Sequence, residues 1–114
     1  MSITRLDIGP RMSQAAIYGD TIYLAGQVNK DAADVTSQTA AVLKQIDDLL
    51  ARAGSSKEKI LSATVYLADM KTFADMNKAW DAWVAAGHCP ARTSLEAKLA
   101  APEYLVEVTA VAAK

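Results

Sequence analysis

The sequence predicts an α+β fold in which two helices pack on one face of a mainly antiparallel sheet. Three observations lead to this prediction: alternating apolar residues around an early glycine turn, two stretches with helical spacing, and three further runs of strand-like composition. In chain order the expected elements are ββαβαββ. A length of 114 residues is typical of one small domain, so we expect residues 1–114 to form a single domain.

The first two strands are expected on either side of Gly19 and Asp20. Residues 15–18 and 22–25 are mainly apolar, and the Gly-Asp pair between them is a turn signal. The two segments therefore predict a β-hairpin, and its second strand leads into Gly26.

The clearest helix is expected to begin at Asp34 or Thr36, either of which can cap it, and to end at Gly54. Its apolar stripe recurs at helical spacing and consists of Thr39, Val42, Leu43, Ile46, Leu49, Leu50 and Ala53. A short turn then leads to residues 60–68, whose apolar and β-branched composition predicts a buried strand.

A second helix is expected from Thr72, which stands three residues before Asp75 as in a capping box, to Gly87. Residues 93–97 and 104–112 are predicted to be the last two strands. The inward stripe of this second helix consists of Phe73, Met76, Trp80, Trp83 and Val84.

Composition argues against several classes of function. The formal net charge is −1 and no segment concentrates Lys or Arg, so we expect no nucleic-acid partner. No apolar run approaches the ~18 residues of a membrane span, and no signal peptide is recognisable, so we expect a cytoplasmic protein without a membrane partner. Cys89 is the only cysteine and His88 the only histidine, so we expect no metal site. The 52% of hydrophobic residues favours additional burial between subunits.

Arg92 is the first candidate for a functional side chain. Its planar guanidinium suits a carboxylate ligand, and Pro90 stiffens the chain just before it. The alternative is a structural arginine that pairs with Glu96, Glu103 or Glu107.

Two further polar residues stand where apolar ones are expected. Asn77 borders the buried stripe of the second helix, where it either caps a backbone group or faces a ligand. Glu107 shares one face of the last strand with Leu105, Thr109 and Val111. If that face is solvated, Glu107 is an ordinary surface acid; if it is covered, the carboxylate needs a partner.

Other chemically active side chains have simpler interpretations. Adjacent residues of an extended segment point to opposite sides, so His88 and Cys89 cannot readily form a nucleophile–base pair. Trp80 and Trp83 are most simply core or subunit-contact residues.

Three segments together resemble the reactive-intermediate deaminase family (Rid, or YjgF-type): residues 19–27, Phe73-Ala74-Asp75-Met76-Asn77, and Pro90-Ala91-Arg92-Thr93-Ser94-Leu95-Glu96, with Glu107 near the end. The resemblance covers essentially the whole chain. It implies a chorismate-mutase-like sandwich and a homotrimer with three equivalent clefts between subunits. It also implies hydrolysis of small enamine and imine acids to 2-oxo acids and ammonia, without a metal or organic cofactor.

The resemblance assigns roles by position. Arg92 matches the arginine that holds the substrate carboxylate, Glu107 the acid that positions the attacking water, and Asn77 a cleft asparagine. Gly26 matches part of the backbone segment beside the ligand. Three further positions of the site differ from the family's usual tyrosine, serine and cysteine, namely Met12, Ala25 and Ser94.

These differences leave a second hypothesis open beside the deaminase. The chain could be a non-catalytic trimer that binds small carboxylate metabolites, with Arg92 as the anchor. RNA cleavage, attributed to some relatives, is ranked last because of the near-neutral charge.

Overall fold

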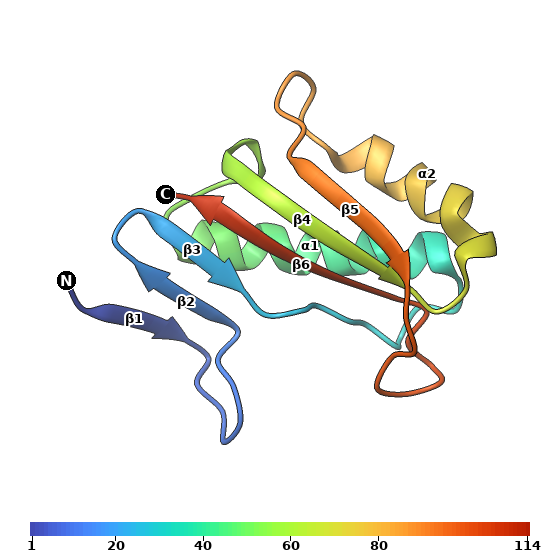
Figure 1. Cartoon of the computed structure of the whole chain (residues 1–114), viewed down its shortest axis with the longest axis horizontal. Helices are drawn as coiled ribbons and strands as arrows, with labels where there is room; N and C mark the ends of the chain where they lie inside the picture. Colours follow the sequence, from blue (N-terminus) through green and yellow to red (C-terminus); the bar gives the residue numbers. More distant parts are fainter.

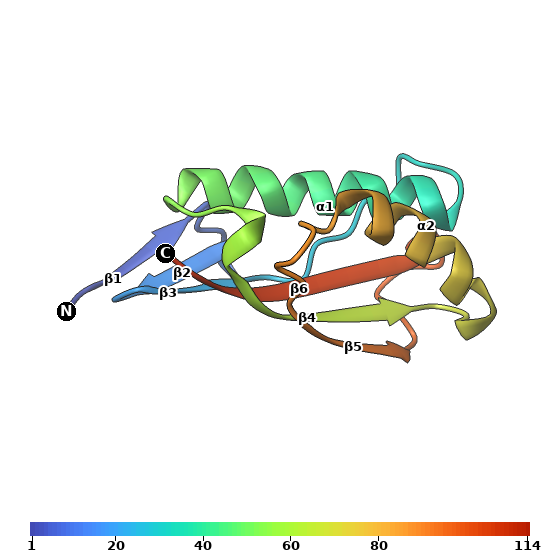
Figure 2. The same cartoon turned by 90° about the horizontal axis from the view of Figure 1, so that it is seen from above.

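The computed structural model describes all 114 residues and confirms the α+β prediction (Figure 1). The helices α1 (Val35–Arg52) and α2 (Phe73–Trp83) both cover the same face of one six-stranded sheet (Figure 2). The opposite face carries no helix, and we call it the open face. The strands are β1 (Ile3–Leu6), β2 (Ala15–Tyr18), β3 (Thr21–Leu24), β4 (Ile60–Leu67), β5 (Ala91–Glu96) and β6 (Val106–Ala113).

The strands lie in the order β1-β2-β3-β6-β4-β5, so β1 and β5 form the two edges of the sheet. Every neighbouring pair is antiparallel except β4 and β5. These two strands are parallel because α2 connects them and returns the chain to the same end of the sheet. The sheet is therefore mixed but mainly antiparallel, as predicted.

Strand β1 is the element that the sequence pattern did not predict. It pairs only with β2, and three of its four residues are exposed. A short edge strand of this kind has little apolar alternation, because no layer covers either of its faces well. The observed order is therefore one strand longer than ββαβαββ at its start.

Helix α1 follows the predicted pattern closely. The Asp34 carboxylate caps its first turn by accepting a hydrogen bond from the Ser37 backbone N–H, at 2.8 Å. Just after its last residue, Gly54 adopts a positive φ of 85°, which favours glycine. The predicted stripe is buried against the sheet, and together with the inner faces of the strands it forms a core cluster of 21 residues.

The predicted start of the second helix was only partly right. Thr72 precedes α2 but makes no side-chain capping bond to it. Its hydroxyl instead donates to the Asp69 carbonyl at 2.6 Å, because a short 3-10 turn, Met70–Thr72, leads into the helix. The helix also ends at Trp83, before Gly87. No helix of the chain is long and apolar enough to cross a membrane.

Alternation along β6 decides which residues reach the open face. Val106, Val108, Ala110 and Ala112 are buried beneath the helices, and the residues between them are only half-buried. Glu107, Thr109 and Val111 therefore project from the open face. Leu105 lies before the strand begins and packs against the core instead.

A buried glutamine on α1 ties the loops at one end of the molecule together. Gln38 is almost completely buried, and its amide nitrogen donates to the carbonyls of Ala32 and Glu103 at 3.0 and 2.9 Å. Its amide oxygen accepts a hydrogen bond from the Leu105 N–H at 2.9 Å. One side chain thus satisfies three backbone groups and fixes the start of β6.

An ion pair holds the loop between β1 and β2 against the end of α1. Arg52 donates two hydrogen bonds of 2.8 Å to the two oxygens of Asp7, a forked geometry that lowers the pKa of the Asp7 carboxyl. Asp7 has a positive φ of 53°, which turns the chain into the loop that carries Met12.

The Gln38→Leu substitution should lower the free energy of unfolding by roughly 3 kcal/mol, because it leaves three backbone groups without a partner. Urea denaturation at fixed protein concentration measures this loss. As a control, Lys44→Leu at an exposed position of the same helix should change the value by less than about 0.5 kcal/mol. Equal effects of the two substitutions would contradict the role given to Gln38.

Candidate functional site

Arg92 lies on the edge strand β5, opposite Ala63 of β4, and its side chain reaches over α2. Its Nη1 donates a hydrogen bond of 2.9 Å to the Asn77 side-chain oxygen and lies 3.9 Å from the Met76 sulfur. Asn77 therefore caps no backbone group; it holds the guanidinium in a defined position.

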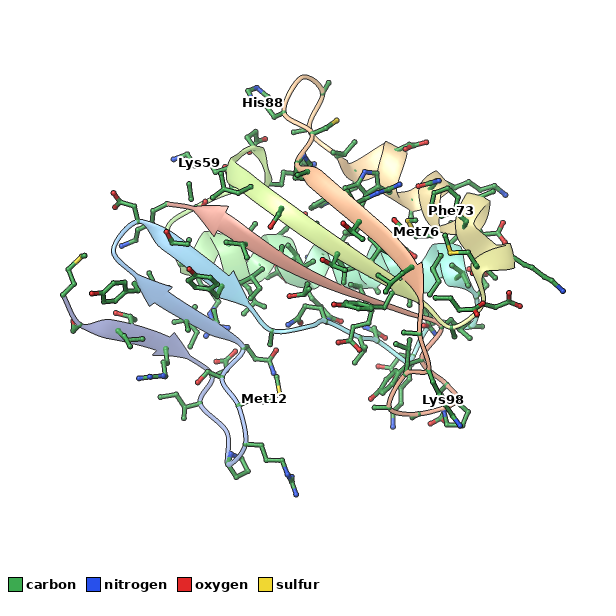
Figure 3. The ribbon with its side chains drawn as sticks, in the orientation of Figure 1. Met12, Lys59, Phe73, Met76, His88 and Lys98 are labelled. Carbon is green, nitrogen blue, oxygen red and sulfur yellow. The ribbon has the colours of Figure 1, made fainter.

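Two aromatic rings of α2 also surround the guanidinium. Its central carbon lies 4.9 Å from the ring centre of Trp80 and 5.7 Å from that of Phe73. Cation–π contacts of this kind hold a charge in place while leaving its N–H groups free. Figure 3 shows Phe73 and Met76 together on α2, beside β5.

The structural alternative for Arg92, a pairing with Glu96, Glu103 or Glu107, is not observed. The ion pairs of the chain join Lys44 to Asp48, Arg52 to Asp7, and Lys78 to Asp75. The Glu96 carboxylate instead accepts a hydrogen bond of 2.9 Å from the Met70 N–H. Arg92 is a half-buried cation without a carboxylate partner in its own chain.

Ser94 lies two residues beyond Arg92 and faces the same side of β5. Its hydroxyl is buried and has no hydrogen-bond partner. The Ala97 backbone N–H donates to the Leu67 carbonyl of β4. In a parallel pair alternate residues bond to the neighbouring strand, so the odd-numbered residues of β5 face β4. The backbone N–H and C=O groups of residues 92 and 94 therefore point to the free edge of the sheet. A ligand beside Arg92 would therefore meet the backbone of Ser94 and not its hydroxyl.

Glu107 lies on the open face of β6, directly opposite Tyr66 of β4, and is half-buried. Its carboxylate rests against Gly26: a Cβ atom added to that glycine would lie 2.0 Å from Oε2 of Glu107. No side chain larger than hydrogen fits there without displacing the carboxylate. The two residues share a groove of ≈ 430 Å³ with Tyr66, Ala97, Lys98, Leu99, Ala100 and Thr109.

Ala25 and Met12 lie at the β2–β3 end of this region. The Ala25 N–H donates to the Gln14 carbonyl at 2.9 Å, which ties the segment after β3 to the start of β2. Met12 is 50% exposed in the loop between β1 and β2. Figure 3 shows Met12 on the opposite side of the molecule from Phe73 and Met76.

The predicted site residues thus form two separate groups. The arginine half consists of Asn77, Arg92 and the Ser94 backbone, on the side of the helices. The glutamate half consists of Gly26 and Glu107, with Ala25 next to Gly26 in the chain; Met12 lies in the loop between β1 and β2 and does not line their groove. Two strand spacings and three residues along the sheet separate Arg92 from Glu107, roughly 14 Å between Cα atoms, and their side chains leave opposite faces. One small ligand cannot touch both within a single chain.

The remaining chemically active residues lie outside both halves. Cys89 is an exposed free thiol in the loop before β5, next to the exposed His88. No group of three or more His, Cys, Asp or Glu side chains is placed to hold a metal ion. Trp80 is 6% exposed and packs on Trp83, with ring centres 5.3 Å apart.

Sequence reasoning missed the surroundings of both halves. Phe73 and Trp80 were assigned to a core stripe, and only the fold shows that they also contact Arg92. Tyr66 could have been placed beside Glu107 by strand alternation, but the pairing of β4 with β6 was not predictable from the pattern.

Comparison with known proteins finds relatives that match the chain over nearly its whole length. The model of a family described as Endoribonuclease L-PSP matches residues 3–114. The chain is 49% identical over 113 residues to the RutC family protein YoaB of Escherichia coli K12, covering 99% of each chain. It is 35% identical to the RutC family protein PH0854 of Pyrococcus horikoshii, covering 94% of this chain and 89% of that one. A crystal structure of NMB1025, a member of the YjgF protein family from Neisseria meningitidis, superposes with a TM-score of 0.98 at 46% identity, covering 100% of this chain and 96% of that one.

The contact between Gly26 and Glu107 yields a prediction of its own. Gly26→Ala should lower the free energy of unfolding by roughly 1 kcal/mol, because the new methyl group must push the flexible, half-buried carboxylate of Glu107 aside. In a Glu107→Ala background most of that loss should disappear, with a coupling energy of about 0.5 kcal/mol or more in a denaturation double-mutant cycle. Equal losses in both backgrounds would show that the two residues are not in close contact.

Proposed function

Because the chain belongs to the Rid (YjgF-type) family, we propose that it is a hydrolytic deaminase of small enamine and imine acids, giving 2-oxo acids and ammonia. This is the activity that its family resemblance implies. The proposed compartment is the cytoplasm, where pyridoxal-phosphate enzymes release such intermediates. The proposal needs no metal or organic cofactor.

The proposal rests mainly on the surroundings of the Arg92 guanidinium. Its charge has no carboxylate partner, it is half-buried, and Asn77 and two aromatic rings orient it. Nε and Nη2 make no hydrogen bond within the chain and remain available. A guanidinium held in this way is suited to a two-pronged, charge-assisted hydrogen bond to a substrate carboxylate.

Glu107 supplies the acid–base chemistry in this proposal. An enamine first gains a proton from solvent on carbon, which gives the iminium ion. As water adds to the C=N carbon, the Glu107 carboxylate takes a proton from it, and a neutral tetrahedral amino alcohol forms. Glu107 then gives this proton to the nitrogen; the C–N bond breaks as the hydroxyl group returns its proton to Glu107, ammonia leaves, and the carbonyl of the 2-oxo acid remains. Such imines already react with water, so positioning and modest proton transfer are sufficient help.

The proposed catalytic cleft lies between two copies of the chain. One copy contributes the arginine half and its neighbour the glutamate half, since one chain cannot bring both onto a small ligand. The proposed assembly is the homotrimer of the family, in which head-to-tail contacts close into a ring. Exposed apolar side chains on the open face support an interface there: Tyr23 is 53% and Leu95 is 38% exposed.

A second candidate, a trimer that only binds small carboxylates, is favoured by three of the predicted site positions. Met12 and Ala25 have no polar side-chain group, and the Ser94 hydroxyl of the arginine half is buried. Arg92 would bind in both cases, so the two functions differ in what Glu107 does.

RNA cleavage, which the description of the matched family suggests, has weaker support. Binding an RNA backbone requires several cations along a surface. The arginine half contains one cation, Arg92, and Lys98 is the one cation that lines the groove of the glutamate half. The formal net charge of the chain is −1.

The direct experiment adds purified protein to 2-iminobutanoate or 2-aminoacrylate generated in situ and follows 2-oxo acid formation. The wild type should accelerate hydrolysis over the protein-free reaction, and Arg92→Ala should remove the acceleration because the carboxylate anchor is lost. A wild-type rate equal to the protein-free rate across a panel of imines would exclude the deaminase.

Glu107→Gln separates the two candidates, since it keeps the shape of the side chain but cannot take a proton. Turnover should fall by about a hundredfold or more in a deaminase. A binder would keep its affinity for 2-oxobutanoate, measured by calorimetry, and would show no turnover in the wild type either.

A mixing experiment tests whether each cleft is shared between chains. Arg92→Ala and Glu107→Gln are each expected to be inactive alone. When equal amounts of the two variants are refolded together, one cleft of each mixed ring, and about one quarter of all clefts, should regain both side chains, and activity should return. Activity that stays at the level of the separate variants, with mixed assemblies demonstrated by mass spectrometry, would argue that both residues act in one chain.

A further inference from the structure

Four side-chain amides form a continuous chain behind the glutamate half. Asn29 donates to Gln45 at 2.9 Å, Gln45 donates to Gln27 at 3.1 Å, and Gln27 donates to Gln14 at 2.8 Å. The chain begins at Asn29 in the segment that follows β3, reaches Gln45 in the middle of α1, returns to that segment at Gln27, and ends at Gln14 just before β2. It thereby ties one of the covering helices to the segment that carries Gly26 (Figure 1).

The direction of this chain is fixed by the backbone. Gln27 also donates to the Ala25 carbonyl at 3.1 Å, and Gln45 also donates to the Val28 carbonyl at 3.2 Å. A carbonyl oxygen can only accept, so the nitrogen of each amide must lie on that side. The Asn29 oxygen accepts from the Asp31 backbone N–H, and the other three amide oxygens each accept from the preceding amide. Hydrogen bonds aligned in one direction strengthen one another.

The cost of disturbing the chain is high because Gln27 is only 6% exposed. A buried amide that loses its partners is destabilised by its full desolvation. The segment therefore has little freedom to move relative to α1 while the chain is intact.

The amides hold in place the backbone at Gly26, against which the Glu107 carboxylate lies. Gln27 exchanges two backbone hydrogen bonds with Val108, of 2.8 and 3.1 Å, so Gly26 lies beside the strand that carries Glu107. At Gly26 the carboxylate fits against the backbone with no room for a methyl group. A shift of a few tenths of an ångström in the segment would therefore move the carboxylate or open a gap beside it.

We propose that Gln27 and Gln45 are positioning residues that set the place of the Glu107 carboxylate by holding the Gly26 segment from the side of α1. Neither lines the groove; they act through Ala25, Gly26 and Val28. The kinetic part of this inference rests on the proposed deaminase function. Its structural part does not, because the position of Gly26 is observable without substrate.

The test uses Gln45→Leu, which removes the link between α1 and the segment at nearly constant volume, with Thr39→Val as the matched control. Thr39 is a fully buried polar residue of the same helix that bonds only to its own turn, at Val35. Both variants are assayed under conditions where circular dichroism shows them folded. Gln45→Leu should lower kcat by at least about tenfold and leave the KM of the imine close to the wild-type value, because Arg92 still binds it. Thr39→Val should change neither constant.

A second readout is the amide resonance of Gly26 in a ¹H–¹⁵N spectrum. Gln45→Leu should shift it well beyond the change caused by Thr39→Val. If Gln45→Leu does not fold, Gln14→Leu at the other end of the chain takes its place, with the same expectations and smaller effects.

The outcomes separate this inference from the proposed function. If the wild type hydrolyses no imine, the deaminase proposal fails, and the Gly26 resonance alone decides the positioning role. If the wild type is active but a folded Gln45→Leu keeps both its kcat and its Gly26 resonance, the positioning role is wrong and the deaminase stands. The positioning role would also be wrong if the two variants lost the same fraction of kcat when compared at equal stability. The loss of rate would then follow from lower stability and not from the lost hydrogen bonds of Gln45.

Discussion

Helices cover only one face of the sheet, and the rest of the structure depends on this asymmetry. In every central strand one set of alternate side chains is buried beneath α1 and α2, while the other set projects from the open face. The two charged residues of the candidate site belong to different sets. The Arg92 side chain lies on the helix side and contacts α2, and the Glu107 side chain projects from the open face. A layer on both faces would have buried Glu107, and a layer on neither would have left Arg92 without Asn77 and its aromatic neighbours.

The two halves of the candidate site are built in different ways. The arginine half is local in the sequence, because α2 is the connection between β4 and β5 and so lies beside the strand that follows it. The glutamate half joins distant parts of the chain. Gly26 follows β3, Glu107 lies on β6, and these two strands are neighbours in the sheet. The amide chain from α1 adds a third distant element to that half.

Much of the fold could be predicted because its signals are local. The Gly19-Asp20 turn, the stripe of α1 and the apolar run of β4 each reflect a nearby physical requirement. The edge strand β1 lacked such a signal, and the Thr72 cap failed because a 3-10 turn precedes α2. At the site, alternation grouped Glu107 with Thr109 and Val111, but it could not tell which face the helices cover. The hydrogen bond from Arg92 to Asn77, the burial of the Ser94 hydroxyl and the close approach of Gly26 to Glu107 depend on packing between elements, which residue spacing does not reveal.

The free edge of β5 has a consequence for the solution behaviour of the chain. Unpaired N–H and C=O groups along an edge strand invite strands of other molecules to add, which is a common route to aggregation. Charged side chains discourage such addition, and β5 carries two of them, Arg92 and Glu96. Arg92, whose guanidinium is suited to binding a carboxylate, therefore also disfavours the addition of further strands at the edge of the sheet. A neutral residue at position 92 would therefore weaken this protection of the edge, independently of any effect on a ligand.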